Sequence, residues 1–180
     1  MKKIVKTIYR FFVNINVFIR CKKLKIKFTK GCFIGKNVTR KGNVTIILGK
    51  NSFIQSGCHF WGSGVVKIGD NTSIGENTWI YASKQGGVYI GDNCTCAANA
   101  YIIDSNHQFK IGQLIKEQDL VSEKICIGSD VWIGANSTFL KGSGCGDGCV
   151  IGACSCLTRY FGEKNLVIAG VPAKILKKRI

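Results

Sequence analysis

The apolar and polar positions of this chain recur with a six-residue period over most of its length. Each unit starts with an apolar residue and a glycine, has Asn or Asp at its fourth position and a small residue at its fifth. Clear copies begin at Ile34, Leu48, Ile68, Ile74, Ile90, Ile127, Ile133 and Ile151. A helix would scatter these apolar residues around its axis, because it turns every 3.6 residues. The pattern instead predicts short strands joined at corners, where Asn and Gly accept a positive φ.

One such unit buries little apolar surface, so its stability must come from coils stacked on one another. The period is interrupted twice, by four extra residues around 84–87 and by a longer insert over 108–124 that starts directly after His107. We expect inserts to leave at corners, and long loops of this kind often form a binding face.

The chain divides into a basic N-terminal segment (1–30), the repeat region (31–170) with its extruded loop (108–124), and a basic C-terminal tail (171–180). Apolar residues of the first segment follow helical spacing. They are Ile4, Ile8, Phe11, Ile15 and Phe18. Lys6 and Arg10 interrupt this stretch, so a membrane-spanning helix is not expected. The predicted helix either lies on an anionic membrane surface or caps the first coil. Pro172 predicts a short C-terminal helix.

Charge is concentrated at the N-terminal end. The formal net charge is +16, and residues 1–69 contain 15 Lys or Arg and no Asp or Glu. This balance favours an anionic partner such as the inner face of the cytoplasmic membrane. Nucleic-acid binding is not expected, because no recognition motif accompanies the charge.

The ten cysteines are expected to be reduced packing residues. No signal-peptide cleavage site follows residues 1–20, which argues against a secreted disulfide scaffold and for a cytoplasmic protein. Their spacings fit no common zinc motif, so no metal is expected. The only histidines are His59 and His107.

The repeat resembles that of hexapeptide-repeat proteins, which fold as a left-handed parallel β-helix with three units per coil. The order of three further features resembles the acetyltransferases of that family, in particular those that O-acetylate sugars and polysaccharides. These features are His107 before a long loop, the segment Val131–Ala135, and the segment Gly170–Lys174. The fold class implied is all-β, with the short N- and C-terminal helices added.

The resemblance implies a site shared between the subunits of a homotrimer that binds acetyl-CoA as co-substrate. His107 would be the general base and Asp104 its orienting partner. The residues matching the family's acetyl-CoA contacts are Trp132, Ala135, Ala153, Thr158, Arg159, Lys174 and Lys177. The three-histidine zinc site of the family's hydrase branch cannot be assembled from two histidines.

Two positions depart from the family pattern. Lys124 stands where Pro often precedes the returning strand, and Cys145 stands where a larger apolar residue usually starts a unit. Neither departure removes a chemical group. His59, followed by Phe60 and Trp61, is a weaker candidate for an acceptor-binding surface, and packing is its simpler interpretation.

The predicted function is acetyl-CoA-dependent O-acetylation of a sugar hydroxyl on a bacterial surface polysaccharide or its precursor, by direct transfer. The alternatives are N-acetylation of a nucleotide-linked amino sugar, acetylation of a free small acceptor, and a non-catalytic β-helix scaffold.

Overall fold

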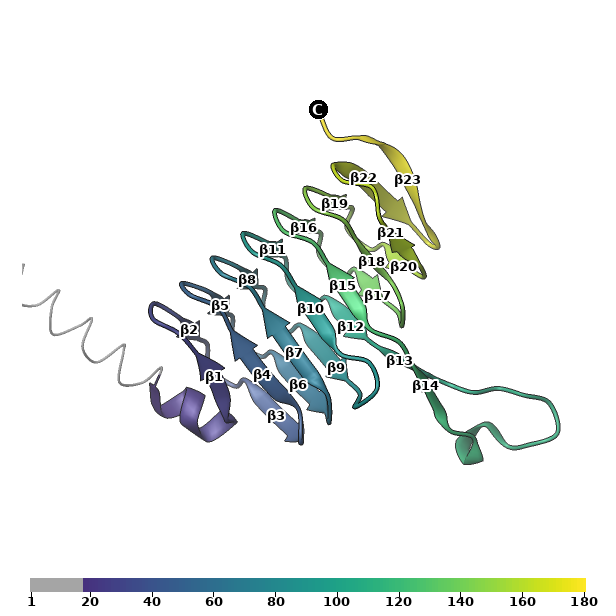
Figure 1. Cartoon of the computed structure of the whole chain (residues 1–180), viewed down its shortest axis with the longest axis horizontal. Coiled ribbons are helices and arrows are strands. Elements are labelled where there is room, and N and C mark those ends of the chain that lie inside the picture. Colours follow the sequence, from purple (N-terminus) through teal and green to yellow (C-terminus); the bar gives the residue numbers. More distant parts are fainter. Residues whose placement is uncertain (1–17) are drawn as a thin grey trace, which may run out of the picture.

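A computed structural model describes residues 18–180 as a parallel β-solenoid, whose coils stack along one axis (Figure 1) and whose strands form three sheets along its length. Successive strands pass from one sheet to the next, so each sheet collects every third strand. Sheet A contains β1 (Ile26–Phe28), β4 (Thr45–Leu48), β7 (Val65–Ile68), β10 (Val88–Ile90), β15 (Ile125–Ile127), β18 (Gly144–Cys145) and β21 (Tyr160–Phe161). Sheet B contains β2 (Phe33–Ile34), β5 (Phe53–Ile54), β8 (Ser73–Ile74), β11 (Thr95–Cys96), β16 (Trp132–Ile133), β19 (Val150–Ile151), β22 (Leu166–Gly170) and β23 (Ala173–Lys178). Sheet C contains β3 (Thr39–Gly42), β6 (His59–Gly62), β9 (Trp79–Ala82), β12 (Tyr101–Ile103), β17 (Thr138–Phe139) and β20 (Cys156–Leu157). The predicted parallel β-helix of six-residue units is confirmed.

The corners use the residues that the repeat predicts. The Asn at the fourth position of the repeat takes a positive φ at successive corners, for example at Asn51, Asn71 and Asn93. The same three side chains form a ladder, in which Asn51 Nδ2 donates to Asn71 Oδ1 over 3.3 Å and Asn71 Nδ2 donates to Asn93 Oδ1 over 3.2 Å. Glycine is required beside them because the coils nearly touch there: a Cβ at Gly91 would lie 2.7 Å from the Gly128 carbonyl.

The core is a single column inside the solenoid. Phe60, Ile80, Ile102 and Phe139 stack in it from sheet C and are at most 1% exposed. All ten cysteines are free thiols, and seven of them are buried in the core. The expectation that all ten are packing residues is wrong for Cys154, which is exposed at a corner, while Cys126 and Cys156 are half-buried. Burial raises the pKa of Cys58 to about 11 and that of Cys96 to about 12, as expected of packing residues. Cys145 is fully buried in place of a larger residue.

The N-terminal end of the described region closes the first coil. Residues 18–24 are helical, Cys21 is fully buried, and Arg20 Nη1 donates to the carbonyl oxygen of Ile34 over 2.6 Å. This part of the predicted helix therefore acts as a cap, as a solenoid end requires. The predicted helical positions from Ile4 to Ile15 lie outside the described residues. No helix within 18–180 has the length and apolar character needed to cross a membrane.

The predicted C-terminal helix is wrong. Residues Ala173–Lys178 form β23, which runs antiparallel to β22 and closes the last coil. Pro172 lies in the turn between the two strands instead of opening a helix. The physical reason is that β22 offers an unpaired edge, and pairing with β23 satisfies backbone groups that a helix would leave exposed.

Candidate active site

The insert after β12 forms an arm that leaves the solenoid between sheets C and A (Figure 1). It starts with β13 (Ser105–His107), which pairs antiparallel with β14 (Leu120–Ser122) so that His107 lies opposite Leu120. The far loop of the arm contains the short 3-10 turn Ile115–Glu117. Its shape is fixed by Gln118, which accepts from the Lys110 backbone N–H over 2.8 Å and donates to the carbonyls of Lys110 and Gln113.

His107 lies exposed at the base of this arm, beside a surface hollow of about 520 Å³. The wall is largely apolar and includes Phe109 and Val121, while Lys141 comes from the corner after β17. The remaining lining residues are Asn106, Gln108 and Lys110. An imidazole at the rim of such a hollow can take a proton from a bound hydroxyl near neutral pH.

Asp104 does not accompany His107. It is fully buried, and its carboxylate accepts from the backbone N–H and the hydroxyl of Ser83 over 2.8 and 3.0 Å, and also from the N–H of Gly87. It therefore holds the loop of residues 83–87, the first interruption of the repeat. The orienting role expected for Asp104 is not supported. Its carboxylate oxygens already accept hydrogen bonds inside the fold, whereas His107, three residues further along the strand, is exposed.

The residues expected to bind acetyl-CoA fall into two groups. Trp132 is 57% exposed on the outer face of sheet B, and strand pairing places Val150, Val167 and Lys177 in the same outward row. Lys174 lies beside this row, opposite Ala169. Ala135 and Ala153 occupy successive corners between sheets B and C, where the Cys154 N–H donates to the Ala135 carbonyl over 2.8 Å.

The second group lies on the other side of sheet C. Thr158 and Arg159 are exposed at the corner between sheets C and A, which is also where the His107 arm leaves. The Arg159 guanidinium lies over the Phe161 ring at 4.9 Å. One chain therefore does not bring His107 together with Trp132, Ala135 and Ala153, because sheet C separates them.

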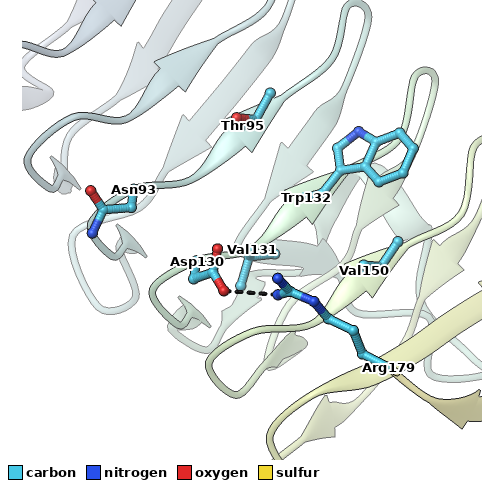
Figure 2. Close-up of a pocket in the computed structure, with 7 residues that line it drawn as sticks. All are labelled: Asn93, Thr95, Asp130, Val131, Trp132, Val150 and Arg179. Atoms are coloured by element: carbon cyan, nitrogen blue, oxygen red, sulfur yellow. Dashed lines mark hydrogen bonds and ion pairs between the residues drawn. The ribbon is translucent and has the colours of Figure 1, made fainter.

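A hollow of about 390 Å³ surrounds Trp132 and extends to the C-terminal strand (Figure 2). Arg179 of the basic C-terminal tail, a residue that the sequence did not single out, pairs with Asp130 over 2.8 Å and donates to the Gly148 carbonyl over 3.1 Å. Figure 2 shows this pair on one side of the hollow and the Trp132 indole on the other. Within residues 18–180, no cluster of three or more His, Cys, Asp or Glu has an arrangement that could hold a metal ion.

Comparisons with known proteins agree with this architecture. The family model described as the hexapeptide repeat of succinyl-transferase matches residues 30–59, 65–103 and 124–159. Its gap at 104–123 coincides with the arm.

Among curated relatives, the chain is 36% identical to WbbJ of Escherichia coli (strain K12), named for lipopolysaccharide biosynthesis O-acetyl transfer. That match covers 66% of this chain and 63% of the relative. This chain is also 31% identical to galactoside O-acetyltransferase of the same organism, over 73% of this chain and 63% of the relative. The chain thus spans less than two thirds of the length of these relatives.

Among solved structures, the fold is similar to that of AntD, an N-acyltransferase from Bacillus cereus in complex with dTDP and 3-hydroxybutyryl-CoA. The TM-score is 0.77 at 22% identity, covering 89% of this chain and 87% of the other.

Asp104→Ala tests the anchoring role of this carboxylate. Loss of the carboxylate leaves the buried N–H groups of Ser83 and Gly87 unpaired, so we expect a destabilisation of about 2–4 kcal/mol in chemical denaturation. Hydrogen exchange at these two amides should accelerate. Asp104→Asn, which keeps one acceptor oxygen, should lose less stability than Asp104→Ala. Unchanged exchange at both amides in Asp104→Ala would contradict the anchoring role.

Proposed function

Since the chain belongs to the hexapeptide-repeat family, we propose that it is an acetyltransferase that uses acetyl-CoA to acetylate a sugar hydroxyl, with His107 as general base. The observation that carries the proposal is the exposed imidazole at the rim of the apolar hollow on the arm. The names of WbbJ and galactoside O-acetyltransferase support a carbohydrate acceptor and transfer to oxygen. They also favour a surface polysaccharide or its precursor as that acceptor.

In the proposed reaction, an imidazole nitrogen of His107 takes the proton of the acceptor hydroxyl as its oxygen attacks the thioester carbonyl. The C–S bond breaks, coenzyme A leaves as the thiol after receiving a proton, and the acetyl ester remains on the sugar. Phe109 and Val121 would exclude water from the reacting atoms, which limits hydrolysis of the thioester. Direct transfer needs no enzyme nucleophile, and the core thiols of Cys58 and Cys96 are unsuited to that role because burial raises their pKa.

The donor would extend along Ala135, Ala153 and Trp132, with its phosphates near Lys174 and Lys177. The alanine corners let an extended ligand approach the backbone closely, and the lysines supply the opposite charge. Because this group and His107 lie on opposite sides of sheet C, the proposal requires two subunits at each site. A closed homotrimer meets this requirement by repeating one heterologous interface three times.

Transfer to nitrogen is the second candidate. AntD is named as an N-acyltransferase and was solved with a dTDP-linked amino sugar in one of its complexes, so an acceptor screen should include nucleotide-linked amino sugars.

The N-terminal end would contact an anionic membrane at the cytoplasmic face. Within the described residues, Phe18 and Ile19 are 50% and 56% exposed, and Lys22 and Lys23 lie next to them. No acidic residue occurs between 18 and 69. Exposed apolar side chains flanked by cations suit a surface of anionic lipid.

His107→Ala tests the general base. We expect kcat for acetyl transfer to fall by about 10²- to 10⁴-fold, while calorimetry shows unchanged binding of acetyl-CoA. Coenzyme A release can be followed with a thiol reagent across hydroxyl and amino acceptors. Lys116→Ala, at the exposed 3-10 turn of the same arm, is the matched control and should retain activity. Full activity of His107→Ala would overturn the assignment, and failure of the unmodified protein to bind acetyl-CoA would overturn the proposed function.

Mixing two inactive variants tests the shared site. His107→Ala removes the base, and Ala153→Trp blocks the alanine corner. If each site takes these two groups from different subunits, refolding an equal mixture should restore about a quarter of the unmodified activity, since half of the subunits carry each intact group. Each variant alone should stay inactive. An inactive mixture that sediments as mixed trimers would contradict the shared site.

Vesicle sedimentation tests the membrane contact. The full chain should sediment with vesicles of phosphatidylcholine and phosphatidylglycerol, and salt should weaken this binding. The double change Phe18→Ser and Ile19→Ser should reduce it severalfold. Leu176→Ser, at the opposite end of the solenoid and 64% exposed, serves as the control. Equal binding to pure phosphatidylcholine vesicles would argue against the electrostatic contact.

A further inference from the structure

Two surface hollows follow one another along the outer face of sheet A, next to the base of the arm. Strands β10, β15, β18 and β21 are neighbours there (Figure 1). One hollow, of about 370 Å³, lies where the arm returns to the solenoid and is lined by Glu123, Lys124 and Ser143. The other, of about 300 Å³, extends to the corner between sheets A and B. Cys126 and Tyr160 line both hollows, which therefore meet at these side chains, and we refer to the two hollows together as the sheet A groove.

The groove adjoins the hollow beside His107. Lys141 lines the hollow of the arm, Glu123 lines the groove, and their side chains form an ion pair over 3.7 Å. Both side chains are partly exposed, so the pair adds little to stability and can open for a ligand that crosses it. Glu123 lies three residues beyond Leu120, which is opposite His107, and this extended stretch spans about 10 Å. One elongated ligand can therefore occupy both spaces.

Sheet A leads away from the subunit contacts of the proposed trimer. That trimer brings the two corners at the ends of sheet C, one with the alanines and one with the arm, against neighbouring subunits. The groove instead extends to the corner between sheets A and B, where Gly69, Gly91 and Gly128 line it. Tyr89 and Tyr160 are 36% and 52% exposed. Within residues 18–180, neither ring pairs with another aromatic ring or lies under a cation, so both rings are available to a ligand.

A buried hydroxyl without a partner lies at the hollow next to the arm. Ser143, which lines this hollow, is 1% exposed, and its Oγ makes no hydrogen bond within the described part of the chain. A buried polar group without a partner is destabilising, and most such groups in native proteins are paired. The fold thus gives this hydroxyl no partner, and a polar ligand group in the hollow would supply one.

Charges of both signs surround the groove. Lys67 and Asp92 line the hollow at the corner between sheets A and B, and Glu123 and Lys124 line the hollow next to the arm. Arg159, beside Tyr160, adds a further cation. A strongly anionic ligand would meet the carboxylates, whereas a neutral, hydroxyl-rich ligand can donate to the carboxylates and accept from the cations. Exposed tyrosine rings add flat apolar faces. Sugar rings combine apolar C–H faces with hydroxyl groups and match this surface.

We propose that the sheet A groove binds the acceptor as a neutral oligosaccharide chain. The sugar unit to be acetylated lies in the hollow of His107, and the units next to it lie along sheet A. Strands β10 and β21, which carry Tyr89 and Tyr160, are three strand spacings apart, about 14 Å, which is longer than one sugar ring. The inference rests on the proposed function for the reacting end of the chain. It implies that acceptor length, and not only the reacting sugar, determines specificity.

Calorimetry on the full chain tests saccharide binding without acetyl-CoA. The probes are glucose and its α-1,4- and β-1,4-linked oligomers up to six units, and N-acetylglucosamine with its β-1,4-linked oligomers of the same lengths. We expect at least one series to bind saturably, with a dissociation constant that falls at least tenfold from the monosaccharide to the tetrasaccharide. It should then level off once the groove is filled. In acetyl transfer with that series, KM should fall in the same way while kcat changes little.

Variants identify the residues responsible. Tyr89→Ala and Tyr160→Ala should each weaken binding of the longest chain about tenfold, and leave acetyl-CoA binding unchanged. Ser143→Ala should also weaken saccharide binding, without lowering the midpoint of thermal denaturation, because its hydroxyl has no partner in the fold. Phe53→Ala is the matched control, since it removes an exposed aromatic ring from sheet B, and it should bind as the unmodified protein does.

Three outcomes would overturn the groove. They are the absence of saturable binding in every series, a length dependence that Tyr89→Ala and Tyr160→Ala leave unchanged, and dissociation of the assembly by Tyr160→Ala, which would make this face a subunit contact. Acetyl-CoA binding is measured on the same samples. If acetyl-CoA binds and no oligosaccharide does, the groove fails and the proposed function stands. If oligosaccharides bind through the two tyrosines and acetyl-CoA does not bind, the proposed function fails and the groove stands.

Discussion

Hydrogen bonding between stacked coils is the constraint on which the rest of the structure depends. Each strand pairs in parallel with the strand one coil away, and corner residues continue the pairing, as where the Gly69 N–H donates to the Ile90 carbonyl over 2.9 Å. This stacking holds only if every coil has the same circumference. Apolar residues must therefore return at fixed intervals, and glycine must stand wherever a Cβ would meet the next coil.

The same constraint explains how the chain can carry insertions. Extra residues cannot be accommodated within a coil, so they leave at the corner between sheets C and A, both at residues 83–87 and at the arm. Asp104 links the two insertions, since it begins the departure of the arm and binds the backbone of the shorter loop. The position of His107 thus depends on a buried carboxylate whose own task is to pair otherwise unsatisfied N–H groups.

A rigid prism also separates chemical groups that sequence alone would assign to one site. The residues expected to bind acetyl-CoA fall into two groups. One group lies on sheet B and its alanine corners, and the other lies at the corner that bears Thr158, Arg159 and the His107 arm. Side chains on different faces of a solenoid cannot approach one another, because the core lies between them. Under the proposed function, assembly with further copies would complete the site. Contact with a neighbouring subunit would then account for the exposed apolar residues of the arm, such as Phe109 and Ile111.

The sequence by itself determined the solenoid, its corner residues, the inward cysteines and the place of both insertions, because a local six-residue period dictates each of them. It also singled out His107, which stands at the junction of the repeat and the insert. Only the tertiary structure decided the partners of Asp104, the pairing of β23 in place of a helix after Pro172, the ion pair of Arg179 with Asp130, and the edge-to-face packing of Trp61 against Trp79. Three of these depend on which residues meet across coils, and strand register fixes such meetings where local spacing does not. The pairing of β23 is local, across the turn at Pro172, and the open edge of β22 decides it.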